Sequence, residues 1–301
     1  MASVIVYADE ASTGRQLASA AKSLGDPVLV TLGEDNADAL SRYYKRVYLL
    51  EDSIFDPLKT YKPIMDVIDK ESTSIVLSPC SNKGRMIAGL IAGGKNFNVA
   101  TDVMKLEHGD EKILVTKLTF GGNAYAKLSM TKPLVACIAS GSYKESEPFP
   151  EPGEIIRISP GDSSLSVKFT PRRLEGADPT KAEVVVGAGR GLKKKEDLEM
   201  IKELASLLGG AWSVTRPLAA DYGWADSWIG ISGLIISPKL YIAIGISGQP
   251  HHTMGVRGSK VIVAINNDES APIFEEADYG VVGDLYNIVP VLIEKLKQRK
   301  K

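Results

Sequence analysis

The stretch AEVVVGAGRGL, residues 182–192, joins an apolar run to a turn with three glycines. Consecutive valines bounded by small residues are typical of a buried strand, and the glycines allow the backbone to turn sharply behind it. Residues 193–208 then place leucine, isoleucine and alanine at helical spacing and stop at Gly209. A strand, a glycine-rich turn and a helix in this order predict a parallel α/β unit.

The same alternation extends on both sides of this stretch. The predicted strands are 3–9, 27–33, 46–51 and 73–79 in the first half, and 240–245, 260–266 and 279–284 in the second. The predicted helices are 12–25, 36–44 and 57–71, with a last helix over 285–300. The second-half strands are continuously apolar, as expected when helices cover both faces of a parallel sheet. The fold class is therefore α/β.

The pattern changes at Lys112. Residues 112–130 and 133–140 read as strands joined by glycine-rich turns, which predicts an antiparallel edge on the first sheet. Residues 143–182 are rich in proline, glycine and charge, as is typical of an exposed connector between domains. We therefore expect an N-terminal parallel-sheet α/β domain over 1–178 and a C-terminal doubly wound domain over 179–301.

Composition excludes several classes of function. The 36 Lys and Arg residues balance 37 Asp and Glu residues, which leaves no basic surface for nucleic acid. No apolar run reaches the roughly 18 residues of a membrane span, and the first residues lack the pattern of a signal peptide. We expect a cytoplasmic protein without membrane insertion. Cys80 and Cys137 lie in apolar stretches without metal or redox spacing, and we expect both to be buried core thiols.

Small and polar residues follow each strand of the second half. Because the carboxyl ends of parallel strands share one edge, we expect these loops to form a ligand site there. The usual dinucleotide fingerprint is broken, since Leu192 stands where its last glycine belongs and no acidic residue follows at the ribose distance. The glycine-rich turn by itself is therefore compatible with either a structural turn or a phosphate site.

Two other kinds of chemistry are disfavoured. His251 and His252 are adjacent and point to opposite sides of an extended segment, and no third ligand stands nearby, so no metal site is predicted. Ser247 misses the GxSxG nucleophile pattern by one position. We predict no catalytic residue.

The order of several motifs in the second half resembles the α subunits of electron transfer flavoproteins. These motifs are VVVGAGRGLK, SVTRP, GISG at 230–233, LYIAIGISG, HH, VIVAINND, APIFEEADYGVVGDL and IVPVL. FGGNAYAKL in the first half is similar to a strand region of the same family, which extends the resemblance to the whole chain. The resemblance implies an FAD-binding C-terminal domain.

The resemblance also implies the residues of the FAD site. It assigns Arg190 to the site, Arg216 to a position over the flavin ring, and Ser232 to a contact with flavin N5. The other implied positions are Thr215, Gly230, Ile231, Ser247, Gly248, Gln249, Pro250, His251, His252, Asn266, Asp284 and Leu285. His252 is expected to donate a hydrogen bond to the flavin, whereas Ile231, Gln249, Pro250 and His251 depart from the family pattern.

By this resemblance the chain is an electron carrier rather than a substrate-converting enzyme. A β subunit is expected to complete a heterodimer, with dehydrogenases, including those of fatty acid β-oxidation, as donors and a quinone reductase or similar acceptor. Two alternatives stay open: a nucleotide-binding module that keeps FAD for structure or sensing, and a stand-alone flavoprotein reductase. The sequence shows no acid/base constellation for the latter.

Overall fold

The computed structural model describes residues 2–52, 54–109, 112–120, 124–165 and 177–299. The chain separates into two compact units, Met1–Thr170 and Pro171–Lys301. The expected boundary at 178/179 falls a few residues later than this division. The glycine-rich turn expected at residues 121–122 lies outside the described residues.

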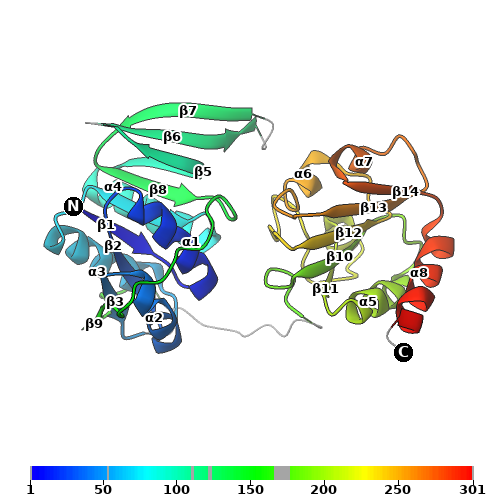
Figure 1. The fold of residues 1–301 in the computed structure, drawn as a ribbon, viewed down its shortest axis with the longest axis horizontal. Coiled ribbons are helices and arrows are strands. Elements are labelled where there is room, and N and C mark those ends of the chain that lie inside the picture. The colour runs from blue at the N-terminus through cyan, green and yellow to red at the C-terminus, as the bar shows by residue number, and fades with distance from the viewer. Residues whose placement is uncertain (1, 53, 110–111, 121–123, 166–176, 300–301) are drawn as a thin grey trace. The chain divides into compact units, whose positions relative to one another are not determined.

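The N-terminal unit is built on a sheet in the order β7-β6-β5-β8-β4-β1-β2-β3-β9 (Figure 1). Its strands are β1 (Ser3–Tyr7), β2 (Asp26–Leu32), β3 (Arg46–Leu50), β4 (Ile75–Pro79), β5 (Asn98–His108), β6 (Lys112–Thr119), β7 (Ala124–Thr131), β8 (Leu134–Ile138) and β9 (Glu154–Ile158). Only the β5–β6 and β6–β7 pairs are antiparallel among the described strands, which confirms the antiparallel edge predicted from Lys112 onward. The run 133–140 was expected to belong to that edge, but it forms β8, which pairs in parallel with β4 and β5 inside the sheet.

Helices cover both faces of this sheet. Helices α1 (Ala11–Lys22) and α2 (Glu34–Leu40) pack on one face, and a 3-10 turn, η1 (Ser41–Tyr43), follows α2. Helices α3 (Pro57–Lys70) and α4 (Asn82–Lys95) pack on the other face. The apolar runs of β1 to β4 are buried between these layers, which confirms the expected parallel-sheet α/β domain.

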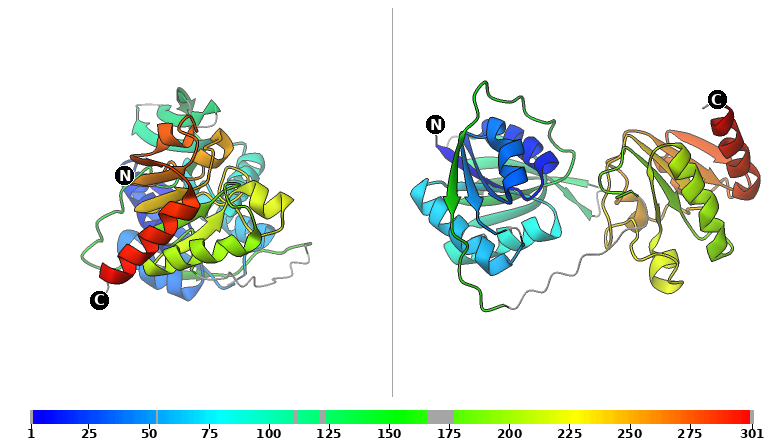
Figure 2. Two further views of the ribbon diagram at one scale, coloured as in Figure 1. Left: turned by 90° about the vertical axis from the view of Figure 1, so that its right-hand side faces the viewer. Right: turned by 90° about the horizontal axis from the view of Figure 1, so that it is seen from below.

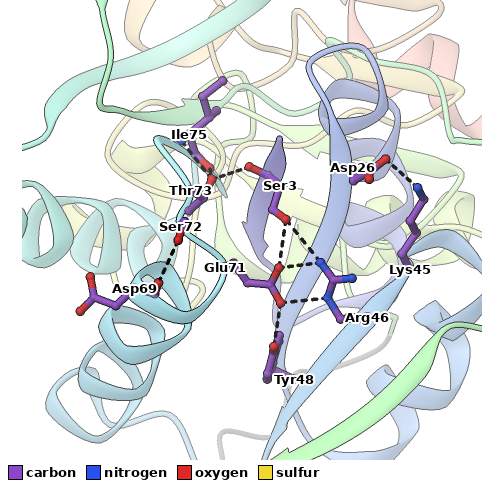
Figure 3. A network of polar contacts seen from close by, with 10 residues as sticks. All are labelled: Ser3, Asp26, Lys45, Arg46, Tyr48, Asp69, Glu71, Ser72, Thr73 and Ile75. Carbon is purple, nitrogen blue, oxygen red and sulfur yellow. Dashed lines mark hydrogen bonds and ion pairs between the residues drawn. The ribbon is translucent and has the colours of Figure 1, made fainter. Parts of the chain in front are cut away.

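A cluster of polar side chains lies at the edge of the N-terminal sheet where strands β1 and β3 begin (Figure 3). Glu71, directly after α3, accepts hydrogen bonds from Arg46 Nε at 2.8 Å, Arg46 Nη2 at 2.5 Å, Tyr48 Oη at 2.7 Å and Ser3 Oγ at 2.9 Å. Burial alone raises the pKa of Glu71, but these donors outweigh it and hold the pKa below its usual range. We call Ser3, Arg46, Tyr48 and Glu71 the Glu71 cluster.

The C-terminal unit holds a parallel sheet in the order β11-β10-β12-β13-β14. Its strands are β10 (Val184–Ala188), β11 (Ala211–Val214), β12 (Leu240–Ile244), β13 (Ile262–Asn266) and β14 (Tyr279–Val282). Helices α5 (Leu198–Leu207) and α8 (Leu285–Arg299) lie side by side on one face (Figure 2). The other elements are η3 (Lys195–Asp197), η4 (Pro217–Asp221), α6 (Pro250–Thr253) and α7 (Ile273–Glu276).

Two expectations about this architecture were wrong. The stretch 143–182 was expected to be a connector, but β9 forms within it and pairs with β3 in parallel. The run 279–284 was expected to be a covered strand, but β14 is an edge strand whose four residues are all exposed. Both β9 and β14 are edge strands, and an edge strand needs neither the continuous apolar run nor the cover of a buried strand.

Candidate FAD site

A cavity of about 690 Å³ lies at the carboxyl edge of the C-terminal sheet. Loops that follow all five strands of that sheet contribute to its walls, as the topology of a doubly wound sheet dictates. Its volume is within the usual range for small-molecule and cofactor sites. The described cavity therefore stands where the strand-end loops were expected to form a ligand site.

Most of the residues expected in the FAD site line this cavity. They are Arg190, Thr215, Arg216, Gly230, Ser232, Ser247, Gln249, His251, His252, Asn266, Asp284 and Leu285. Ile231, Gly248 and Pro250 were expected there too but are not among the lining residues. Ile231 is 48% exposed, and its backbone N–H donates to the His251 carbonyl oxygen at 2.8 Å.

The glycines of the opening stretch bring two loops into backbone contact. A Cβ on Gly191 would lie 2.6 Å from the Cα of Gly245, and a Cβ on Gly189 would lie 2.3 Å from the Gly245 carbonyl oxygen. The Gly191 N–H donates to that same oxygen at 2.9 Å. These two glycines are therefore required by the approach of one loop to the other, which favours the structural-turn interpretation for them.

Several polar groups of the cavity have no partner in the described part of the chain. The exposed Arg190 and Arg216 side chains make no hydrogen bond or ion pair with any described residue. Thr215 is buried, and its Oγ1 has no hydrogen-bond partner there. The backbone N–H groups of Ser247 and Gln249 are also unpaired within the described ranges. A buried polar group without a partner is costly, and the exposed arginine side chains are free to meet an anionic ligand.

Ser232 is held in place by a neighbouring tryptophan. Trp228 Nε1 donates to Ser232 Oγ at 3.2 Å, and both residues line the cavity. The Ser232 oxygen is the acceptor in this bond, so its own hydroxyl hydrogen stays available to another acceptor. A hydroxyl oriented in this way suits the polar contact that the resemblance assigns to Ser232.

His252 is fixed in one uncharged form. Its Nδ1 lies 3.2 Å from the Ile229 carbonyl oxygen and its Nε2 lies 2.9 Å from Tyr241 Oη. A carbonyl oxygen only accepts, so Nδ1 carries the proton and Nε2 accepts from the tyrosine. Burial lowers the pKa of His252 to about 4, although the bond to Ile229 opposes this shift.

The expectation that His252 donates a hydrogen bond to the flavin does not fit this arrangement. Both ring nitrogens face protein atoms, which leaves no ring N–H for the cavity. The partner of His252 Nε2 is the Tyr241 hydroxyl. A Cβ on Gly187 would lie 2.0 Å from this hydroxyl oxygen, so only glycine fits at position 187. Gly187, the first glycine of the stretch 182–192, thus makes room for the tyrosine that holds His252.

Asn266 and Asp284 shape the cavity wall with their side chains. Asn266 Nδ2 donates to the Ile246 carbonyl oxygen at 2.8 Å, and its Oδ1 accepts from the Asp268 N–H at 3.0 Å. Asp284 Oδ1 accepts from the Tyr286 N–H at 2.9 Å. Both residues were expected to bind FAD. The Asn266 amide joins its loop to that of Ile246, whereas the Asp284 bond lies within its own segment.

Sequence reasoning missed several lining residues. They include Lys193, Pro217, Trp228, Ile246, Asn267, Asp268, Pro272 and Tyr286. Tyr286 directly follows the expected Leu285, and its hydroxyl accepts from the Lys193 N–H at 2.7 Å. Adjacency to an expected residue was the available signal for Tyr286 and Asn267, while nothing in the sequence brings Trp228 to Ser232.

The unpaired groups of the cavity suit the FAD that the resemblance implies. Arg190 and the unpaired N–H groups match the anionic pyrophosphate, while the positive charge of Arg216 and the hydroxyl groups match the polar edge of a flavin. Among the described residues there is no group of three His, Cys, Asp or Glu side chains placed to hold a metal. Within the same residues, every helix is too short or too polar to cross a membrane.

Comparisons with known proteins agree with this fit. Residues 9–163 match the model of the electron transfer flavoprotein domain, and residues 178–257 match that of the electron transfer flavoprotein FAD-binding domain. The chain is 31% identical over 307 residues to YdiR of Escherichia coli K12, whose name describes an electron transfer flavoprotein subunit, with 98% of each chain covered. It is 31% identical to the FixB proteins of Escherichia coli O139:H28, with 97% of each chain covered, and Salmonella typhimurium LT2, with 98% of each covered. The chain therefore belongs to the electron transfer flavoprotein family, and FAD is the cofactor of its C-terminal domain.

Proposed function

We propose that this chain is the α-type subunit of a two-subunit electron carrier and that its cavity holds the FAD. The observation that carries the proposal is the set of unpaired cations and N–H donors at the carboxyl edge of the C-terminal sheet. When bound, FAD supplies the redox chemistry by accepting and releasing electrons at its flavin ring. The chain binds the cofactor, orients it and sets the charge around it.

The proposed roles of the lining residues follow from their chemistry. Arg190 and the N–H groups of Ser247 and Gln249 suit the negatively charged part of FAD. Arg216 places a permanent positive charge at the cavity, which favours electron uptake by a nearby flavin. Ser232, oriented by Trp228, presents its hydroxyl hydrogen as a donor. Thr215 presents a buried hydroxyl that has no other described partner.

His252 has a different role in this proposal from the one that the resemblance implied. Because it is neutral and both nitrogens are engaged, it adds neither charge nor a ring donor to the cavity. It instead fixes the Ile229 carbonyl and thereby the segment that leads to Ser232. Arg216 is then left to provide the positive charge near the flavin.

The proposal extends to partners. We propose that a β subunit completes the heterodimer in the cytoplasm, that dehydrogenases reduce the FAD and that a quinone reductase or similar acceptor reoxidises it. YdiR is named as a subunit of such a protein, which supports the expectation of a partner chain. The departures at Ile231 and at Gln249, Pro250 and His251 keep one alternative in view, an FAD held for structure or sensing.

One experiment separates the carrier from this alternative. The chain is purified alone and with a β subunit, its visible absorption is recorded, and it is titrated with a reductant under nitrogen. A carrier shows bound flavin that is fully and reversibly reduced, and Arg216→Ala lowers the potential of that flavin. A flavin whose potential does not respond to this substitution favours the structural role. A colourless preparation that takes up no FAD with its partner present contradicts the proposal.

A further inference from the structure

The two cysteines of the chain meet at the carboxyl edge of the N-terminal sheet, in the unit that has no part in the FAD cavity. Cys137 lies within β8, and Cys80 directly follows β4, the parallel neighbour of β8. The Cys80 N–H donates to the Ile138 carbonyl oxygen at 2.9 Å. The expectation of two buried core thiols holds only for Cys137, because Cys80 is half-buried.

Three N–H groups converge on the sulfur of Cys80. Arg85 Nε and Nη2 each lie 3.4 Å from Sγ, and the Asp102 backbone nitrogen lies 3.2 Å from it. A neutral thiol is a weak acceptor, whereas a thiolate accepts several hydrogen bonds. This arrangement therefore stabilises the deprotonated sulfur.

The fold builds this arrangement from two separate elements. Helix α4 begins at Asn82 and places Arg85 on its first turn, beside the preceding Cys80. Strand β5 changes register between Ala100 and Val103, and Asp102 within that irregularity has a φ of 58°. The left-handed backbone turns the Asp102 N–H toward the sulfur while its carboxylate meets Arg85 at 2.6 Å.

Charges around the sulfur act in both directions. The Cys80 thiol can donate to Asp102 Oδ1 at 3.5 Å, and this carboxylate disfavours a second negative charge on the sulfur. The Arg85 guanidinium contacts both groups and opposes this effect. Hydrogen bonding with the Cys137 thiol lowers the pKa of Cys80, burial raises it, and the Arg85 contacts lower it further, so that the net shift is downward. The contact with Cys80 and burial raise the pKa of Cys137.

We propose that Cys80 is an oxidation-sensitive modification site whose thiolate is held by Arg85 and the Asp102 N–H and reacts with hydroperoxides. With hydrogen peroxide, the sulfur attacks one peroxide oxygen, an S–O bond forms and the O–O bond breaks. Sulfur loses two electrons to the peroxide, and the departing hydroxide takes a proton from the solvent to become water. The product is a sulfenic acid at Cys80.

Cys137 does not resolve this product as a disulfide. It stands opposite Ser78 in the parallel register, so Cys80 lies two residues further along the neighbouring strand. Strand spacing and rise then separate the two Cα atoms by about 8 Å, beyond the usual range for a disulfide. Cys137 instead remains a reduced core thiol that touches Ser78 Oγ at 3.4 Å.

The first test compares alkylation of the full chain in its native and denatured states by peptide mass spectrometry. Iodoacetamide is expected to label Cys80 in the native chain and Cys137 only after denaturation. The pH profile of the Cys80 rate is expected to have a midpoint at least one unit below the value of about 8.5 for a free cysteine. A midpoint at or above that value, or equal labelling of both thiols, overturns the proposal.

Substitutions identify the source of this reactivity. Arg85→Gln is expected to raise the midpoint of the profile by about one unit, and Arg85→Lys, which keeps the charge without the two-nitrogen contact, by less. The matched control is Lys83→Gln, which removes a cation of the same turn that is paired with Asp9 at 2.9 Å. An equal shift in the control contradicts the assignment of Arg85. Circular dichroism verifies that each variant is folded.

The second test uses hydrogen peroxide followed by dimedone, which traps sulfenic acids. The adduct is expected on Cys80 in the parent chain and in Cys137→Ser, and on no residue in Cys80→Ser. Absence of an adduct in the parent overturns the proposal, and a Cys80–Cys137 disulfide contradicts the assignment of Cys137. Both tests use the chain without added FAD, so their outcome does not depend on the proposed electron-carrier function.

Discussion

The Glu71 cluster and the proposed FAD cavity each gather charged and hydroxyl side chains at an edge formed by parallel strands, but they differ in where their hydrogen bonds go. In the Glu71 cluster, Arg46, Tyr48 and Ser3 all donate to one carboxylate whose side chain is 8% exposed. In the cavity, Arg190 and Arg216 have no described partner, and neither does the buried Thr215 hydroxyl. Polar groups that satisfy one another stabilise the fold, whereas polar groups without a protein partner at a cavity are available to a ligand.

The strongest way to test this contrast is to remove the acceptor of the Glu71 cluster. Glu71→Met leaves three donors without their shared partner, and we expect the free energy of unfolding to fall by about 3 kcal/mol. Urea denaturation followed by circular dichroism measures the change. The control is Glu145→Gln, which breaks a similar two-nitrogen contact with Arg15 at a glutamate whose side chain is 51% exposed, and should cost about 0.5 kcal/mol. An equal loss of unfolding free energy in the two variants would show that the burial of Glu71 does not strengthen its contribution to stability.

Acid should weaken the C-terminal unit through His252. Its pKa of about 4 in the folded chain lies below the value of about 6.5 in the unfolded chain. The unfolded chain therefore binds more protons between these values, and stability is fully present above pH 6.5 and is lost as the pH falls toward 4. The loss between pH 7 and pH 5 should be about 2 kcal/mol. The difference should shrink in His252→Gln, measured by denaturation at both pH values, and an unchanged pH dependence would contradict the buried neutral form.

Removing an unsatisfied cation should affect the ligand and not the fold. Arg216→Ala is expected to weaken FAD binding about tenfold, or about 1.4 kcal/mol, and to leave the stability of the ligand-free chain unchanged. Fluorescence titration with FAD measures the affinity. Lys239→Ala serves as the control, because Lys239 is a cation of the same unit that pairs with Glu183 away from the cavity. Equal effects of both substitutions would remove Arg216 from the site.

The smallest expected effect has the opposite sign from the first. Thr215→Val replaces an unsatisfied buried hydroxyl by a methyl group of similar size, and should stabilise the ligand-free chain by about 0.5–1 kcal/mol. The same substitution should weaken FAD binding. Denaturation and FAD titration on one preparation measure both quantities. Destabilisation of the ligand-free chain would show that the hydroxyl already has a partner, and would weaken the comparison with the Glu71 cluster.

The sequence predicts the elements whose residues carry a regular pattern. The runs of β1 to β4, β10, β12 and β13 are apolar because both faces of these strands are covered. Helix α4 was not predicted, since four glycines interrupt its pattern, and one of them, Gly84, is required because a Cβ there would lie 2.0 Å from the Pro79 carbonyl oxygen. Strand β5 was missed because its register shifts disturb the alternation of buried and exposed residues.

The site could be predicted at the level of loops but not of contacts. Parallel strands bring their carboxyl ends to one edge of the sheet whatever the detailed geometry. The order of strands and helices along the chain was therefore enough to find the lining loops. Nothing in the sequence shows that Tyr241 meets His252 or that Asn266 bonds to Ile246. Such contacts depend on side-chain directions across loops, and they decide which expected residues remain available to a cofactor.

The contact between Gly191 and Gly245 has a consequence for the thermodynamics of binding. Because the two loops touch through their backbones and share a hydrogen bond, neither can move far without the other. The cavity walls are thus ordered before the cofactor arrives, and association does not have to restrict these loops further. The free energy of binding FAD is then reduced less by the entropic cost of ordering these loops. Amide hydrogens in this part of the wall should therefore exchange at similar rates in the free and bound chains.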